Sequence, residues 1–476
     1  MIRFASLFAL ALLLAASGAA QAPAGTSDFP PTPPAPGEPQ PFEIPEGRTF
    51  ALDNGIEVTL VPYGALPKAD VLAVVRVGNV DEGAGQNSLA DLMMDVLQEG
   101  TTSRSGTEIA EAAASMGGSL STGAGLDQST VGGRVLAEFV PDFVALAADV
   151  LQNPAFPAEG LARAQRNRLR SAAVARSQPG TLALAAFRRA LYGPEHPYTA
   201  ALLPIATDIE AATVADVRAF YDANVGPART RLYVVGQFDE AATEAAVRDA
   251  FGAWDAPAEA ADPAPPTASG GRQVVLVDQP GVAQSNVIVG LPTIDPAADP
   301  QEVVALQVTN ALLGGAFGSR ITRNIREDKG YTYSPVSSVS SRFRDAYWAE
   351  TAAVVTEATG PALAEILFEI DRLAAEAPPE AELRGIQNYL AGTFVLQNAS
   401  AGGIAGFLAF LDLHGIDRGY LEDYVDRVYA VTPEDVRATV AERLRSDDMA
   451  IVVVGDRSVV ERQIALFGDV DVQTVE

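Results

Sequence analysis

Two patterns of hydrophobic and polar residues alternate along this chain. Short runs that alternate between apolar and polar residues are typical of strands. The clearest pair lies at residues 50–62, where Asp53-Asn54-Gly55 between two such runs predicts a hairpin. Longer stretches with apolar residues three and four positions apart predict helices. Helices are expected at residues 88–98, 105–116, 140–151, 161–192 and 213–224, and further strands at 71–77, 119–124, 128–136 and 231–236.

The second half of the chain repeats a pattern found in the first. Thr213 and the following DVRA recur as Thr432 and DVRA, and Val234-Val235-Gly236 recurs as Val453-Val454-Gly455, both with an offset of 219 residues. Strands and helices interleave, but several strands are joined as hairpins, which favours sheets with antiparallel pairs. We therefore expect an α+β fold of two homologous α/β domains, each a mostly antiparallel sheet covered by helices on one face.

Shifts in composition mark the limits of these halves. Residues 1–22 have a basic start, an apolar run and an Ala20-Gln21-Ala22 site, which predict a cleavable signal peptide and export to the periplasm. The apolar run is shorter than the ~20 residues that span a bilayer, so no stable membrane anchor is expected. Residues 23–46 are proline-rich and predict a disordered spacer. With a second linker at 256–271, the predicted domains are residues 47–255 and 272–476.

Composition excludes several kinds of chemistry. The net charge of −28 argues against a nucleic-acid partner, because such binding depends on Lys and Arg neutralising phosphates. The chain has no cysteine, which excludes a thiol nucleophile and thiolate metal ligands. Its two histidines, His196 and His414, have no partner at metal-ligand spacing, so both are expected to be structural. A G-x-S-x-G nucleophile elbow is absent as well.

Residues 313–340 are predicted to form a short helix followed closely by a strand. Phe317, Ile321 and Ile325 recur every four residues, which predicts one face of a short helix. Gly330 follows as a residue able to take the left-handed conformation that ends helices. Beyond the glycine, residues 331–340 are expected to form a strand.

Several stretches of the chain resemble the pitrilysin/insulinase family of zinc peptidases. They are LDNGIEVTLVP, QEGT at 98–101, MGGSLSTGAGLDQST at 116–130, HPY at 196–198, LYVVG and SRITRNIREDKGYTYS. The resemblance covers residues 47–470 in family order. It implies a peptidase fold in which one helix carries H-x-x-E-H, whose histidines bind zinc and whose glutamate activates water, with a further glutamate ligand downstream.

The zinc motif is degenerate in this chain. Its five positions hold Asp91, Leu92, Met93, Met94 and Asp95. No acidic residue occurs between Glu159 and Glu195, and the downstream helix instead carries Arg163, Arg166, Arg168 and Arg170. The chain is therefore expected to have no catalytic residue of its own and to bind no metal or other cofactor. Asp91 and Asp95 are expected to be solvated on a helix surface, and the arginine helix to face solvent.

The chain keeps one pair of residues that is functional in the family. Arg326 and Tyr333 match, in spacing and context, an Arg and a Tyr that in this family reach across to the zinc site of the other half or of a partner. The resemblance implies that they are substrate-binding residues, since both are hydrogen-bond donors suited to a carbonyl or an oxyanion.

The chain has lost the zinc motif but keeps the Arg–Tyr pair, and two functions are consistent with this difference. The first is the zinc-less subunit of an exported heterodimeric metallopeptidase that cleaves unfolded peptides, with zinc supplied by a homologous partner bearing H-x-x-E-H. The alternative is a catalytically inactive scaffold or peptide-binding protein of the same fold.

Overall fold

The computed structural model describes residues 45–194, 196–258 and 270–474. The predicted signal peptide, nearly all of the proline-rich spacer and most of the predicted linker lie outside the described residues. These predictions therefore stay untested, and so do the domain limits drawn from them.

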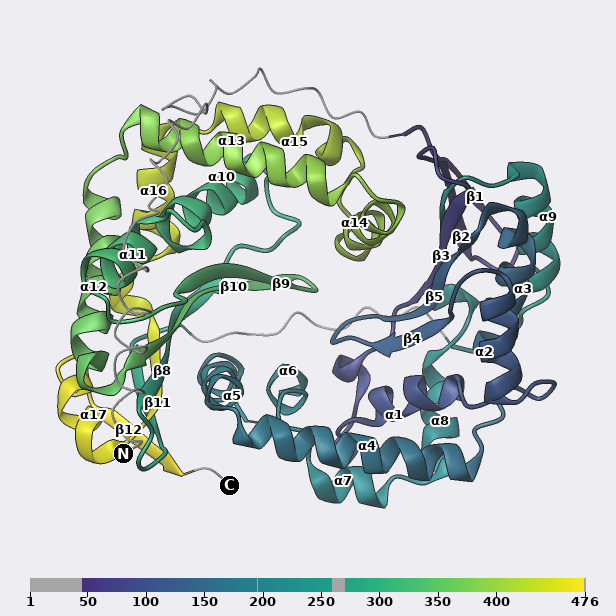
Figure 1. Cartoon of the computed structure of the whole chain (residues 1–476), viewed down its shortest axis with the longest axis horizontal. Coiled ribbons are helices and arrows are strands. Elements are labelled where there is room, and N and C mark those ends of the chain that lie inside the picture. Colours follow the sequence, from purple (N-terminus) through teal and green to yellow (C-terminus); the bar gives the residue numbers. More distant parts are fainter. Residues whose placement is uncertain (1–44, 195, 259–269, 475–476) are drawn as a thin grey trace, which may run out of the picture. The chain divides into compact units, whose positions relative to one another are not determined.

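The first half of the chain builds a six-stranded mixed sheet in the order β1-β2-β6-β3-β5-β4 (Figure 1). β1 and β2 pair antiparallel around the turn at Asp53, which confirms the predicted hairpin. β6 inserts between β2 and β3 and runs parallel to β2. The strands are β1 (Arg48–Ala51), β2 (Glu57–Pro62), β3 (Lys68–Val75), β4 (Ser121–Ala124), β5 (Ser129–Leu136) and β6 (Thr230–Gly236).

The second half builds a second six-stranded sheet in the order β12-β7-β11-β8-β10-β9. From β7 to β9 it repeats the order of the first sheet from β2 to β4, as the sequence repeat predicts. Thr213 and Thr432 both cap their helices through the same capping box with the aspartate three residues on. The strands are β7 (Gln273–Asp278), β8 (Gln284–Thr293), β9 (Val336–Arg342), β10 (Asp345–Val355), β11 (Ala450–Gly455) and β12 (Val470–Thr474).

Helices pack on both sheets, and one prediction about them was wrong. The single helix expected at 161–192 is two helices, because Gln178, which precedes Pro179, has an extended backbone. The helices of the first half are α1 (Leu89–Leu97), α2 (Gly106–Ser115), α3 (Val140–Gln152), α4 (Ala158–Ser177), α5 (Pro179–Tyr192), α6 (Pro197–Ala200), α7 (Ala206–Ala211), α8 (Val214–Asn224) and α9 (Glu240–Phe251). Those of the second half are α10 (Pro300–Asn310), α11 (Arg320–Thr322), α12 (Thr359–Ala375), α13 (Glu380–Gln397), α14 (Ala401–His414), α15 (Gly419–Ala430), α16 (Pro433–Arg443) and α17 (Arg457–Ile464), with two π-helical segments, η4 (Ala311–Gly315) and η5 (Arg323–Asp328).

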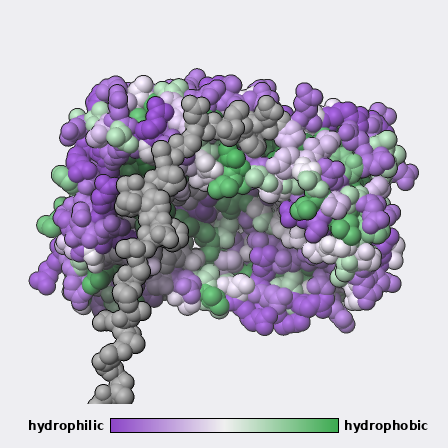
Figure 2. Space-filling view, turned by 45° about the horizontal axis from the view of Figure 1, so that its top comes forward, coloured by the Kyte–Doolittle hydropathy of each residue, from purple (hydrophilic) through white to green (hydrophobic). Residues whose placement is uncertain are grey.

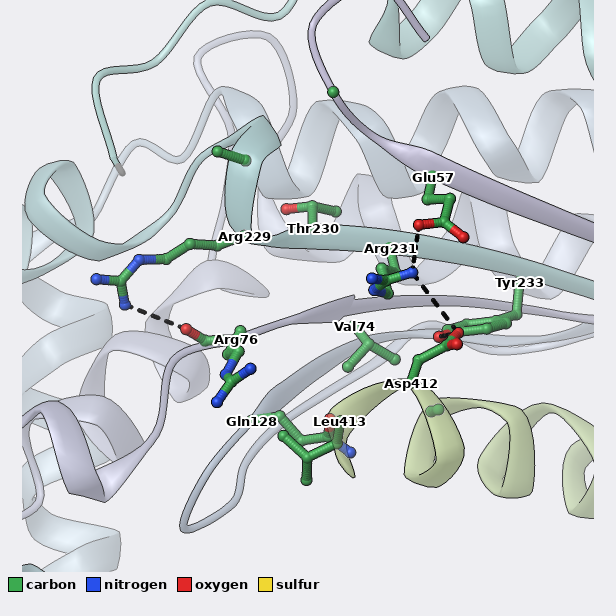
Figure 3. Close-up of a pocket in the computed structure, with 13 residues that line it drawn as sticks. Glu57, Val74, Arg76, Gln128, Arg229, Thr230, Arg231, Tyr233, Asp412 and Leu413 are labelled. Atoms are coloured by element: carbon green, nitrogen blue, oxygen red, sulfur yellow. Dashed lines mark hydrogen bonds and ion pairs between the residues drawn. The ribbon is translucent and has the colours of Figure 1, made fainter. Parts of the chain in front are cut away.

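The two halves exchange one helix each. α5 of the first half packs on β8 and β11 of the second sheet, where Leu182 and Phe187 join a cluster with Ile288. α14 of the second half packs on β3 and β6 of the first sheet. There the Tyr233 hydroxyl donates a hydrogen bond to Asp412, and Figure 3 labels both side chains. Each sheet is therefore stabilised on one face by a helix that belongs to the other half of the sequence.

The face drawn in Figure 2 is mostly hydrophilic. Hydrophobic residues occur on it in small groups among hydrophilic ones, as expected for a chain with 20% charged residues. In the described part of the chain, no single helix has the length and apolarity to cross a membrane. α13 and α14 pass that test only as a pair, with a bend of 106° between them.

Candidate functional site

The degenerate zinc motif lies on α1, which packs against α4, α8 and β4 (Figure 1). Leu92, Met93 and Met94 are fully buried, so the residue at the general-base position is a thioether in the core. Asp91 and Asp95 lie on the side of the helix that meets α4, with side chains 18% and 33% exposed.

Arg168 of α4 binds both aspartates. Its Nε and one terminal nitrogen donate to Asp95 Oδ2 and Oδ1 at 2.7 and 2.8 Å, and its other terminal nitrogen lies 3.0 Å from Asp91 Oδ1. A bidentate guanidinium–carboxylate pair is among the stronger charge-assisted contacts in proteins. The prediction that the two aspartates are solvated was wrong, because the arginine at the helix crossing occupies the space between them.

Further polar groups complete this cluster at the start of α1. Asn79 donates through Nδ2 to Asp91 Oδ2 and to Glu82 Oε1, both at 3.0 Å. Glu82 also accepts hydrogen bonds from the backbone N–H groups of Ser88 at 3.1 Å and Ala90 at 2.9 Å. A negatively charged carboxylate at this place stabilises the N-terminus of the helix. Burial raises the pKa of Asp91, and the Arg168 guanidinium opposes that rise.

This arrangement does not fit zinc. Both carboxylates are engaged by the guanidinium, and in the part of the chain that the structure describes no histidine bonds to either of them. In residues 45–194, 196–258 and 270–474, no group of three or more His, Cys, Asp or Glu side chains could hold a metal ion. Of the other helix arginines, Arg163 pairs with Glu99 and Arg170 with Asn167, so only Arg168 enters the degenerate motif.

The stability of the protein is expected to fall between about pH 4.5 and 7 because of Glu82. Burial raises the pKa of this carboxyl from 4.5 to about 7, against the hydrogen bonds from Asn79 and the backbone. In that window the unfolded chain has lost the proton that the folded chain retains, so rising pH favours unfolding. At ~1.4 kcal/mol per pKa unit, the loss is at most about 3.5 kcal/mol.

Glu82→Gln mimics the protonated acid and should remove this part of the pH dependence. The free energy of urea unfolding, measured from pH 4 to 8, checks this against wild type and the exposed Glu111→Gln control. Parallel pH profiles for wild type and Glu82→Gln would contradict the assignment.

The segment that carries Arg326 is irregular rather than a plain helix. α11 has three residues and continues as the π-helical η5, and such segments are frequent at functional sites. Ile321 and Ile325 are fully buried, but Phe317 is 69% exposed and precedes the helix, whose N-cap is Ser319. The prediction that Phe317 shares their face was therefore wrong. Gly330 has φ +64° and ends the segment as predicted.

Polar contacts fix this segment to α12 and α13. Arg320 donates two hydrogen bonds to Glu382 at 2.9 and 2.8 Å. Asn324 donates to Glu365 at 3.0 Å and to Glu369 at 2.8 Å. These contacts hold the backbone while leaving the Arg326 side chain on the outside of the segment.

Arg326 lies between two exposed aromatic rings. Its guanidinium carbon is 4.4 Å from the ring centre of Phe317 and 5.0 Å from that of Tyr333, and we call these three residues the Arg326 sandwich. Tyr333 is 77% exposed. Among the described residues, no carboxylate lies within ion-pair distance of Arg326, whose side chain is partly buried. The structure thus brings together the two residues that the sequence paired and adds Phe317, which the helix periodicity had misplaced.

Tyr333 does not lie in a strand. β9 begins only at Val336, and in residues 331–333 only Thr332 forms an isolated bridge, with Val354. Tyr331 packs against the core while Tyr333 does not, which separates the two tyrosines. The strand predicted at 331–340 is therefore confirmed only from Val336 on.

The two histidines lie in packed surroundings. His196 accepts the N–H of Tyr198 at 3.2 Å and stacks on Tyr192, with ring centres 5.1 Å apart. His414 is buried at the end of α14 beside Phe410. Burial lowers the pKa of both, which favours neutral rings.

A polar cavity of about 210 Å³ lies where α14 meets the first sheet (Figure 3). Three arginines line it, and two of them pair with carboxylates. Arg231 pairs with Glu57 at 2.5 Å and lies 3.9 Å from Asp412, and Arg229 pairs with Asp81 at 3.1 Å. The guanidinium of the third, Arg76, lies over the ring of Phe343, 3.7 Å from its centre.

Comparisons with known proteins agree on one family. The family model described as Insulinase (Peptidase family M16) matches residues 65–196, and the model described as Peptidase M16 inactive domain matches residues 211–390. An uncharacterized zinc protease of Mycobacterium tuberculosis is 26% identical over 413 residues, which cover 86% of this chain and 93% of that protein. Another from Streptomyces coelicolor is 25% identical over 407 residues, covering 83% and 87%.

Solved structures share the fold. The crystal structure of a peptidase M16 inactive domain from Pseudomonas fluorescens has a TM-score of 0.79 at 25% identity and covers 86% of this chain and 98% of its own. A protease from Helicobacter pylori has a TM-score of 0.78 at 18% identity, with coverage of 87% and 100%. The expected two-half α+β fold is thereby confirmed.

Proposed function

Because the chain belongs to the insulinase family, peptidase M16, we propose that it is the zinc-less subunit of an exported heterodimeric metallopeptidase. Its partner is a homologous subunit that carries H-x-x-E-H and supplies the zinc. Their substrates are unfolded peptides, and their compartment is the periplasm.

The observation that carries this proposal is the contrast between the two family sites. At the degenerate motif, Arg168 binds Asp91 and Asp95 and leaves no place for a metal. At the Arg326 sandwich, Tyr333 is exposed and Arg326 is partly buried, on a segment anchored by the ion pair between Arg320 and Glu382. The carboxylates of the first site are paired with a cation, whereas Arg326 has no carboxylate partner among the described residues.

The role of this chain is to hold the substrate. The Arg326 guanidinium and the Tyr333 hydroxyl donate hydrogen bonds to a peptide carbonyl, and these strengthen as negative charge develops on its oxygen. The cation between two rings keeps its orientation before substrate arrives, which lowers the entropy lost on binding.

A scaffold without turnover is the second candidate. It is favoured by the ion pairs at the degenerate motif and by the name of the Pseudomonas fluorescens relative as an inactive domain. In that case the sandwich would bind peptides or a partner without contributing to cleavage.

Co-purification from cells separates the two candidates. A tagged copy of this chain should retain a homologue bearing H-x-x-E-H, identified by mass spectrometry. The pair should cleave an unfolded peptide and contain zinc, while this chain alone should do neither. A chain that purifies as a homodimer, with no such homologue and no cleavage in any fraction, would favour the scaffold.

A further inference from the structure

A buried acid lies in the core of the second half. Glu350 of β10 is fully buried, and in the sheet it lies between Val289 of β8 and Ser337 of β9. Side chains alternate between the two faces of a strand, so Glu350 shares its face with Trp348, whose indole N–H donates to Asn310 at the end of α10. On this face the sheet is covered by η4.

The carboxyl of Glu350 has no ordinary partner. In the part of the chain that the structure describes, neither of its oxygens makes a hydrogen bond and no charged side chain acts on it. Burial raises the pKa of Glu350 well above its ordinary value of 4.5, and the backbone of Val336 offsets this rise only in part. Because an isolated carboxylate in an apolar core is very costly, such a group keeps its proton instead. Glu350 is therefore a neutral acid where ordinary glutamates are charged.

The elements packed around this carboxyl bring no described charge to it. β8 and β9 place a valine and a serine beside it, and η4 places Gly314 against it. The acids of the neighbouring helix α12, Glu365 and Glu369, bind Asn324 instead. The gain and loss of a proton here thus depend on how well Glu350 is sealed from water.

η4 seals this acid through a glycine. Gly314 lies so close to Glu350 Oε2 and Ser337 Oγ that a Cβ on the glycine would collide with both atoms. η4 is π-helical, a form that is rare and frequent at functional sites. It packs on β9, α11, α12 and α13, and at its end the backbone N–H of Ala316 donates to the carbonyl of Ala311 at 3.0 Å.

The Arg326 sandwich begins directly after η4. Phe317 lies three residues beyond Gly314, and Arg320 of α11 then ties the segment to Glu382 of α13. A displacement of η4 would therefore move one ring of the sandwich and loosen the segment that presents Arg326.

We propose that Glu350 is a proton-dependent positioning residue for the Arg326 sandwich. The neutral acid allows η4 to close over it. When Glu350 releases its proton to solvent, the carboxylate must reach water, which opens η4 and the segment that follows. The inference rests on the proposed function only in the use of Arg326 for cleavage.

The ratio of open to closed η4 should then depend on pH. In the open form Glu350 has an ordinary pKa near 4.5, whereas in the closed form it keeps its proton to higher pH. Rising pH therefore favours the open form, and between the two pKa values the ratio rises about tenfold per pH unit.

Hydrogen–deuterium exchange of the chain alone, followed by mass spectrometry from pH 5 to 8, measures this ratio. After correction for intrinsic exchange rates, the protection of amides in residues 311–316 and 319–328 should fall about tenfold per pH unit in wild type. Glu350→Gln, which mimics the neutral acid, and the apolar Glu350→Met should give protection that does not change with pH. The control Glu357→Gln removes an exposed acid just after β10 and should match wild type.

A flat profile in wild type, or equal slopes in wild type and both Glu350 variants, would overturn the inference. A slope confined to residues 311–316 would overturn the link to Arg326. A slope shared to the same extent by β6 of the first half would indicate unfolding of the whole chain and would also overturn it. Because the measurement needs no partner, the expected slopes without any zinc-bearing subunit in cells would keep this inference and reject the proposed function.

Discussion

If this chain is the subunit proposed above, Arg326→Ala is expected to lower kcat/KM of the two-chain peptidase by about 10²–10³-fold, the usual cost of removing one donor to a developing oxyanion. The loss should fall mainly on kcat, since the contact strengthens in the transition state. Initial rates with a quenched fluorescent peptide measure both constants. The fold should be unaffected, because among the described residues Arg326 makes no ion pair and its two ring contacts are with the exposed Phe317 and Tyr333.

Arg323 provides the matched control for this experiment. It belongs to the same π-helical segment, is exposed, and donates only to the carbonyl of Gly318 at 3.3 Å among its described partners. Arg323→Ala should keep nearly full activity. Tyr333→Phe retains the ring beside Arg326 and removes only the hydroxyl. The decrease in activity of this variant therefore measures the contribution of the second hydrogen bond. If the double variant Arg326→Ala/Tyr333→Phe kept full activity, the pair would not contribute to cleavage.

Arg168→Ala should lower the free energy of unfolding by about 2 kcal/mol. Removing one partner of a buried ion pair costs ~3–5 kcal/mol, and partial exposure reduces this value. Arg168 is 30% exposed, and its loss leaves Asp91 and Asp95 facing each other without a cation. Urea unfolding followed by circular dichroism at pH 7 measures the change. The exposed Arg166→Ala on the same helix should stay within about 0.5 kcal/mol of wild type.

A compensating variant tests the cause of that loss. Adding Asp91→Asn and Asp95→Asn to Arg168→Ala removes the unpaired charges and should recover more than half of the lost stability. No recovery would mean that Arg168 stabilises the helix crossing by packing of its aliphatic stem. A wild-type stability for Arg168→Ala alone would show that the ion pairs contribute nothing.

The features predicted correctly from the sequence depend on neighbours along the chain. The Asp53 hairpin and the helix predicted from residue 213 depend on residues within a few positions of one another. The departure from the zinc motif was visible in the same way, from five consecutive residues of α1.

What could not be predicted depends on contacts between distant elements. Arg168 reaches Asp91 only because α4 crosses α1, and no local pattern distinguishes it from the other arginines of its helix. Phe317 fits a four-residue period but lies before Ser319, where the helix begins. Its stacking on Arg326 follows from the folded path of residues 317–333 and not from the hydrophobic spacing.

The exchange of α5 and α14 between the halves constrains the order of folding. α5 is synthesised about ninety residues before β7, yet Leu182 and Phe187 become buried only when the second sheet exists. The first half must therefore wait, with an apolar helix uncovered, until β8 and β11 are available. Long-range closure of this kind slows folding and exposes aggregation-prone surface. Until then, a chaperone that binds this helix would keep it from associating with other chains.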